Sequence, residues 1–145
     1  MQFDNNNPVI QLCAQGMQKE GEGNPNVAKQ LFYEAWKMAA TPVDKFVAAH
    51  YVARHQETVE EKLAWNEKCL GIALLIADEQ MRANYPSLYL NVAKCHEDMH
   101  NMDEAQKHYM LALSYTGLLA DDGYGNMIKT GIKKGLERIT TANNL

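Results

Sequence analysis

Capping residues followed by proline recur along this chain, and they constrain its fold more than any other feature of the sequence. Proline's fixed φ suits the first position of a helix, and an asparagine or threonine side chain before it can cap the free backbone amides there. Such pairs occur at Asn7-Pro8, Asn24-Pro25 and Thr41-Pro42, and Tyr85-Pro86 is a weaker fourth case. All four prolines of the chain therefore mark predicted helix starts.

Apolar residues recur between these starts at intervals of three and four, as in Val27, Leu31, Ala35 and Met38. This interval places them on one face of a helix, whereas the residues of a half-buried strand would alternate. Two capping boxes, in which a glutamate follows the capping residue by three positions, add further helix starts at Thr58 and Asn101. The sequence predicts an all-α protein with helices over residues 8–20, 25–40, 42–56, 59–80, 86–100, 102–118 and 122–140.

Composition limits the class of protein. With 145 residues, 46% of them hydrophobic, the chain is long enough for one hydrophobic core, and we expect a single domain over residues 1–145. A formal net charge of −4 disfavours binding to nucleic acid or to an anionic membrane surface. We see neither a signal peptide nor an apolar stretch that approaches the length of a membrane span, so we expect a cytoplasmic protein without a membrane partner.

One small-large-small pattern occurs in two of the predicted helix pairs. In each pair, a helix with a small residue near its middle is followed at the same distance by a helix of the form A-x-x-x-aromatic-x-x-A. The pair at 42–80 is looser, with Ala49 or Ala53 in the small position. The clear examples are Gly16 followed by Ala28, Phe32 and Ala35, and Ala93 followed by Ala105, Tyr109 and Ala112.

This pattern resembles the tetratricopeptide repeat, a helix-turn-helix unit whose small residues let two helices pack closely. The resemblance implies an α–α superhelix of about three pairs, at residues 8–40, 42–80 and 86–118, with a capping helix at 122–140. It also implies that the first helices of the pairs line a concave groove. The chain departs from the family's pattern at His96, which stands where an aromatic residue is usual.

Three longer segments, at residues 48–70, 87–100 and 121–132, resemble a small group of bacterial tetratricopeptide-like proteins. Some similar sequences carry a label as ribosomal RNA adenine methyltransferases. A methyltransferase would need a strand, a glycine-rich turn and a ribose-binding acid to hold its cofactor, and this sequence has no such combination. We therefore expect no cofactor, and an enzymatic or RNA-related role is an alternative only.

Candidate partner-binding residues follow from the groove that the resemblance implies. His50 and Arg54 lie four residues apart on one face of a predicted first helix, and Asn91 and Lys94 lie on the next one. Together they would form a basic strip, on which Arg54 can bind a carboxylate of a protein or peptide through two hydrogen bonds. Alternatively, this face is solvated and Arg54 pairs with Glu57.

The stretch HEDMH, residues 96–100, matches the H-E-x-x-H pattern of zinc proteases. In the repeat pattern, however, it spans the end of one helix and the turn into the next, so His96 and His100 need not share a face. Glu104 lies beyond that turn and His108 is on the following helix, which leaves no evident third ligand. We expect the stretch to serve packing and the turn, and we predict that the chain binds no metal.

No catalytic residues emerge from the sequence. Cys13, Cys69 and Cys95 lie in apolar stretches, where burial raises a thiol pKa and makes the residue unreactive. In the last predicted helix, Gly123 and Gly125 fit a tight turn better than a phosphate-binding loop. We therefore predict a non-catalytic module that binds a protein or peptide, with a small-ligand sensor as another alternative.

Overall fold

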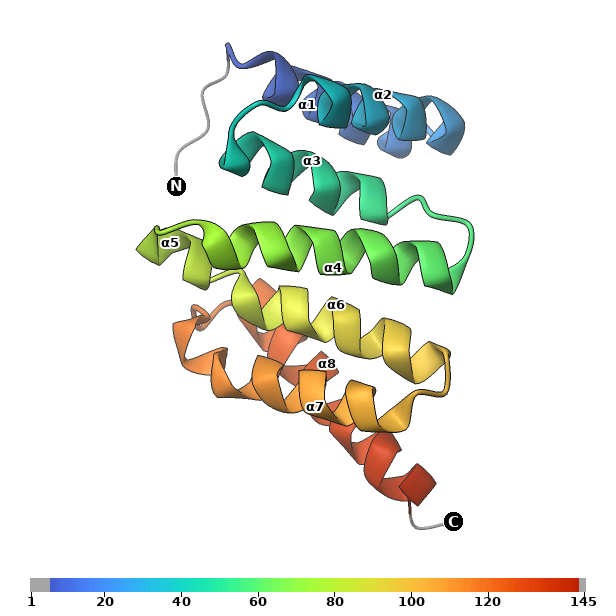
Figure 1. Cartoon of the computed structure of the whole chain (residues 1–145), viewed down its shortest axis with the longest axis vertical. Helices are drawn as coiled ribbons and strands as arrows, with labels where there is room; N and C mark the ends of the chain where they lie inside the picture. The colour runs from blue at the N-terminus through green and yellow to red at the C-terminus, as the bar shows by residue number, and fades with distance from the viewer. Residues whose placement is uncertain (1–5, 144–145) are drawn as a thin grey trace. The chain divides into compact units, whose positions relative to one another are not determined.

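The computed structural model describes residues 6–143, and these residues form helices, turns and bends without a strand. This confirms the prediction of an all-α fold (Figure 1). The helices are α1 (Pro8–Gly21), α2 (Pro25–Met38), α3 (Pro42–Ala53), α4 (Val59–Leu75), α5 (Glu79–Arg82), α6 (Tyr85–Asp98), α7 (Met102–Ser114) and α8 (Gly123–Asn143), with a 3-10 turn, η1 (Thr116–Leu118). None of these helices is both long and apolar enough to span a membrane.

Most of the predicted caps form. Oδ1 of Asn7 accepts the amide of Val9 at 2.9 Å, and Oγ1 of Thr41 accepts the amide of Asp44 at 3.1 Å. Asn24 and Asn101 precede α2 and α7 but make no capping hydrogen bond through their side chains. At these two helices the predicted start is therefore right, while the predicted capping interaction is wrong.

The predicted helix 59–80 is broken in the structure. Helix α4 ends at Leu75, where Ile76 takes an extended conformation, and the short α5 begins two residues after Ala77. Asp78 caps α5 by accepting the amide of Gln80 at 2.7 Å. A β-branched residue and an aspartate, both poor in helix interiors, explain why the helix stops here.

The helices form two compact units, unit 1 (Met1–Ala77) and unit 2 (Asp78–Leu145). In unit 1, α1 packs against α2, α3 contacts both, and α4 packs against α3. In unit 2, α6 packs against α7, and α8 crosses this pair (Figure 1). The predicted single domain over residues 1–145 stays a prediction.

The small and aromatic residues of the repeat pattern lie in the core, as predicted. Phe32 and Tyr109, together with the alanines that flank each of them, have 0% exposure. Gly16 faces the Phe32 ring so closely that a Cβ atom there would lie 2.3 Å from Cε1. The small residue is thus required by the close approach of α1 to an aromatic side chain.

The turns inside these two helix pairs share one backbone arrangement. After α1, Gly23 has a φ of 76°, and after α6, His100 has a φ of 61°. In both turns the next residue, Asn24 or Asn101, donates its amide at 2.9 Å to a carbonyl of the last helical turn. This is a left-handed helix end of the kind that normally uses glycine, and His100 occupies it in the second turn.

Helix α8 covers unit 2 largely as predicted. The sequence pattern predicts one apolar side for this helix, made of Met127, Ile128, Ile132, Leu136 and Ile139. Ile128, Ile132 and Ile139 are buried and Leu136 is half-buried, but Met127 is 60% exposed, so its predicted place on the apolar side is wrong. The amide of Gly125 donates to Oδ1 of Asp122 at 2.7 Å at the helix start. This bond favours the interpretation of the glycine-rich stretch as a turn.

Candidate functional site

The four predicted groove residues lie in different units. His50 and Arg54 belong to α3 and its end in unit 1, while Asn91 and Lys94 belong to α6 in unit 2. Because the four residues are divided between two units, their convergence on one surface stays a prediction. What the structure gives is the local environment of each residue.

Arg54 caps the end of α3 and reaches across to α1. Its Nη2 donates to Oε1 of Glu20 at 3.1 Å, and its side chain is 44% exposed. The guanidinium carbon lies 5.0 Å from the centre of the Tyr51 ring. Arg54 therefore pairs with Glu20 of α1, and not with Glu57 as in the alternative prediction.

His50 is half-buried and surrounded by aromatic rings. Its ring stacks on Phe46 with centroids 6.5 Å apart and meets Tyr51 edge-on at 5.4 Å. Burial and, to a lesser extent, the nearby Arg54 cation lower the pKa of His50. The imidazole is therefore neutral near pH 7 and can offer a hydrogen bond but no charge to a partner.

With Glu20, two further residues that no sequence pattern marked, Tyr51 and Met17, complete this surface. The hydroxyl of Tyr51 contacts Sδ of Met17 at 3.2 Å, and Met17 is 42% exposed. The Tyr51 ring also stacks on the buried Phe32 at 5.0 Å, which fixes its position. We use the name α1–α3 face for the surface formed by Met17, Glu20, His50, Tyr51 and Arg54.

The sequence places Tyr51 near the end of the predicted helix, just before Arg54, but it does not predict which residues Tyr51 contacts. The three-four spacing of apolar residues assigns Tyr51 to neither the buried nor the exposed side of α3. The observed Tyr51 ring is half-buried, stacks on Phe32 and lies beneath Arg54. Edge positions of this kind depend on the rotation of α3 against α1, which the sequence pattern does not specify.

In unit 2, Asn91 is half-buried and Lys94 is exposed. Nζ of Lys94 pairs with Oδ1 of Asp98, one turn later on the same helix. Such i,i+4 pairs on a helix surface are weak, at about 0.3–0.5 kcal/mol, so a partner's carboxylate can compete with Asp98. These contacts do not test the predicted role of Asn91 and Lys94 in partner binding, which stays a prediction.

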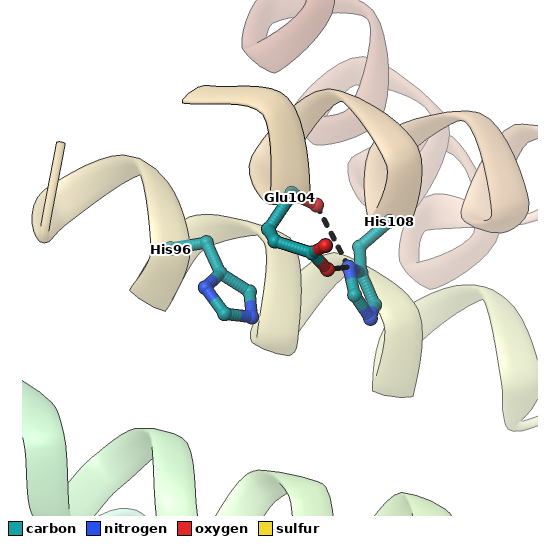
Figure 2. Close-up of side chains that lie close together, drawn as sticks. All are labelled: His96, Glu104 and His108. Carbon is teal, nitrogen blue, oxygen red and sulfur yellow. Dashed lines mark hydrogen bonds and ion pairs between the residues drawn. The ribbon is translucent and has the colours of Figure 1, made fainter. Parts of the chain in front are cut away.

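The HEDMH stretch behaves only partly as predicted. Helix α6 ends at Asp98, so the exposed His100 lies outside it, while His96 is 8% exposed within the helix pair. The premise that no third ligand is within reach was wrong. His96, Glu104 and His108 offer ligand atoms that all lie within 4.8 Å of one another (Figure 2), because α6 and α7 run back along each other after the turn.

Cys13, Cys69 and Cys95 are buried, as their apolar stretches predicted. Burial, with a small contribution from Asp44, raises the pKa of Cys13 to about 11, and burial raises that of Cys69 to about 12. Both side chains therefore stay protonated near neutral pH and are poor nucleophiles or metal ligands.

An open cavity of about 690 Å³ lies between α7 and α8. Its lining includes the apolar Leu113 and Leu136 and the charged Lys129, Lys133 and Glu137. Together with Lys134 and Arg138, Lys129 and Lys133 make this last helix rich in basic residues.

Comparisons with known proteins identify the fold of this chain but not its family. No family model matches this chain. No curated protein matches it. Among solved structures, it is similar to PcrH from Pseudomonas aeruginosa, with 18% sequence identity and a TM-score of 0.61 over 96% of each chain. At this identity the likeness shows the fold alone, and it agrees with the helix pairs above: the chain has an all-α, tetratricopeptide-like fold.

Proposed function

We propose that this chain is a non-catalytic module that binds a protein or peptide partner, and that the α1–α3 face is part of its binding surface. The observation that carries this proposal is the arrangement of Tyr51 and Arg54: the half-buried Tyr51 ring stacks on Phe32, and the exposed Arg54 lies over that ring and pairs with Glu20. Tyrosine and arginine are the residue types that most often dominate binding energy at protein interfaces. The tetratricopeptide-like fold supports the same function, because its helix pairs present extended surfaces to partners.

Arg54 suits a partner with an acidic or carboxylate-ended segment. Its bond to Glu20 uses Nη2, which leaves the other guanidinium donors for a partner's carboxylate. Met17, which contacts Tyr51, offers an adaptable apolar contact, as methionines do at binding surfaces. A carboxylate would have to compete with Glu20 for the arginine, so this glutamate should limit the affinity.

Asn91 and Lys94 belong to the same proposal. If the first helices of successive pairs line one surface, as the tetratricopeptide resemblance implies, these two residues extend the basic strip beyond Arg54. They would then contact a segment of the partner that the α1–α3 face does not reach. We also propose that the module acts in the cytoplasm.

The cavity between α7 and α8 favours a second candidate, a sensor for a small anionic ligand. Its leucine and lysine lining fits an apolar molecule with one acidic group. The enzymatic and RNA-related alternative gains no such support, since residues 6–143 contain none of the strands that a dinucleotide-type cofactor fold would need.

Photo-crosslinking in living cells tests the main proposal. A photoreactive amino acid replaces Met17, on the α1–α3 face, or Glu34, an exposed residue of α2 that serves as the control. We expect one protein to be linked from position 17, not from position 34, and to be lost when Arg54→Ala is added. Equal labelling from both positions, or position-17 labelling that Arg54→Ala leaves unchanged, would contradict the proposal.

A further inference from the structure

We propose that His96, Glu104 and His108 bind a divalent transition-metal ion of the zinc type. The three residues come from two helices: His96 from the last turn of α6, and Glu104 and His108 from the first half of α7. Figure 2 shows the three side chains gathered on the facing sides of α6 and α7. The site belongs to unit 2 and uses none of the residues of the α1–α3 face.

The donor set and its spacing suit such an ion. Two imidazoles and one carboxylate are a known ligand set for zinc and for other first-row metals. Ligand atoms on a tetrahedral zinc ion lie roughly 3.3–3.6 Å apart, given bonds of about 2.0–2.2 Å. The observed atoms lie within 4.8 Å of one another, so side-chain shifts of about 1 Å would bring them to an ion.

Hydrogen bonds already orient both rings. Nδ1 of His108 lies 2.7 Å from the backbone carbonyl of Glu104 and 3.7 Å from Oε2 of its carboxylate, so an ion bound at this nitrogen would replace the hydrogen bond to the carbonyl. Nδ1 of His96 lies 3.4 Å from the side-chain amide of Asn101. Holding a histidine through one ring nitrogen while the other binds metal is the usual outer-shell arrangement of metal sites.

Solvent can reach the site from one side. His96 is buried and the His108 side chain is 16% exposed, while the Glu104 side chain is 44% exposed and lies 3.7 Å from His108. An ion can therefore enter past Glu104, and three protein ligands leave a fourth position for water. If no ion binds, the same contacts have a purely structural role. The His96 and His108 rings then pack against each other with centroids 5.2 Å apart, and Glu104 and His108 form an ordinary i,i+4 pair.

Calorimetric titration of the full, untagged chain with Zn²⁺ after chelator treatment distinguishes these two roles. We expect one Zn²⁺ per chain, and a Kd raised more than about 10-fold by His108→Ala and by Glu104→Gln. The second variant changes an exposed side chain, so it tests the site even if His108→Ala weakens the fold. His100→Gly, which removes the other histidine of the HEDMH stretch, should leave the Kd unchanged.

Three further readouts complete the test. Mg²⁺ and Ca²⁺ should not compete, because they prefer all-oxygen ligands. Zn²⁺ should raise the Tm of the wild type but not of Glu104→Gln, because an ion held between α6 and α7 binds the folded state. The absorption spectrum of the Co²⁺ complex should lack the charge-transfer band of a cobalt–thiolate bond.

Absence of Zn²⁺ binding would overturn the proposal. So would a Kd that neither Glu104→Gln nor His108→Ala changes, or a thiolate band that places the ion on Cys13, Cys69 or Cys95. A Kd that rises only with His100→Gly would move the site to the HEDMH stretch itself and also contradict it. None of these outcomes affects partner binding at the α1–α3 face, so the two proposals can fail separately.

Discussion

Glu97 accepts two hydrogen bonds from Arg138, from Nε at 2.7 Å and from Nη2 at 3.0 Å. The hydroxyl of Tyr109 donates to the same carboxylate at 2.6 Å. One carboxylate thus joins α6, α7 and α8 at the end of unit 2. The hydrogen bonds from Arg138, followed by that from Tyr109, lower the pKa of Glu97 in spite of its partial burial.

The first prediction follows from this lowered pKa. A carboxyl whose pKa is lower in the folded than in the unfolded state stabilises the fold above its unfolded pKa, and this stabilisation is lost as the pH falls through the folded pKa. We expect Glu97→Gln to reduce the free energy of unfolding by about 1 kcal/mol near pH 7. The difference from wild type should shrink as the pH falls below about 4.

Urea unfolding at a series of pH values measures this difference. Glu137→Gln, which changes an exposed glutamate of α8, is the matched control and should cost little at any pH. A difference between wild type and Glu97→Gln that stays constant from neutral to acid pH would show that the carboxylate charge is not what stabilises this junction.

The fold was largely predictable because local signals agree with one another. Capping residues, prolines and the three-four spacing of apolar residues each act within one helix, and they predicted the start of almost every helix. The small-large-small pattern likewise predicted which side chains fill each pair, such as Gly16 against Phe32. The break after Leu75 was missed because the apolar spacing continues through it.

The site was less predictable because it depends on residues that are distant in sequence. Glu20 pairs with Arg54 across two helices, and Glu104 and His108 meet His96 only through the rotation of α7 against α6. Spacing along one helix made HEDMH conspicuous, but it could not show that Glu104 and His108 lie near His96. Long-range contacts of this kind follow from tertiary packing, which a sequence period does not determine.

The second prediction compares two glycines in helices. A Cβ atom at Gly135 would lie 2.3 Å from Cζ of Tyr109, whereas one at Gly71 would meet nothing within 4 Å. We expect Gly71→Ala to stabilise the protein by about 1 kcal/mol, since alanine favours the helix. Gly135→Ala should instead destabilise it by about 1–3 kcal/mol through overpacking. Chemical denaturation of both variants measures the contrast, and equal gains in stability would disprove the close approach of α8 to Tyr109.

The third prediction concerns the left-handed residue after α6. His100 has a φ of 61°, which costs a residue with a side chain roughly 1 kcal/mol relative to glycine. We expect His100→Gly to raise the free energy of unfolding by about that amount. Gly23→Ala, at the matching position after α1, should lower it. Two substitutions with effects of the same sign would show that these turns do not share one backbone arrangement.

The fourth prediction concerns the extent of the binding surface. If Asn91 and Lys94 lie on one groove with Arg54, a combined Asn91→Ala and Lys94→Ala variant should bind the partner more weakly than wild type while its Tm changes little. Lys107→Ala, which changes an exposed residue of α7, should bind as wild type does. Unchanged affinity of the combined variant would confine the binding surface to unit 1.

Isothermal titration of the crosslinked partner's acidic segment against four forms of the chain tests the central claim most directly. Arg54→Ala should weaken binding about 10-fold or more, since charge-assisted hydrogen bonds contribute about 1.5–3 kcal/mol each. Glu20→Gln should tighten it by removing the internal competitor for Arg54, and Lys133→Ala should leave it unchanged. The Tm of Arg54→Ala should stay close to that of wild type, because exposed ion pairs contribute little stability. Equal affinity of wild type and Arg54→Ala would contradict the account, and a loss confined to Lys133→Ala would place the partner on α8 instead.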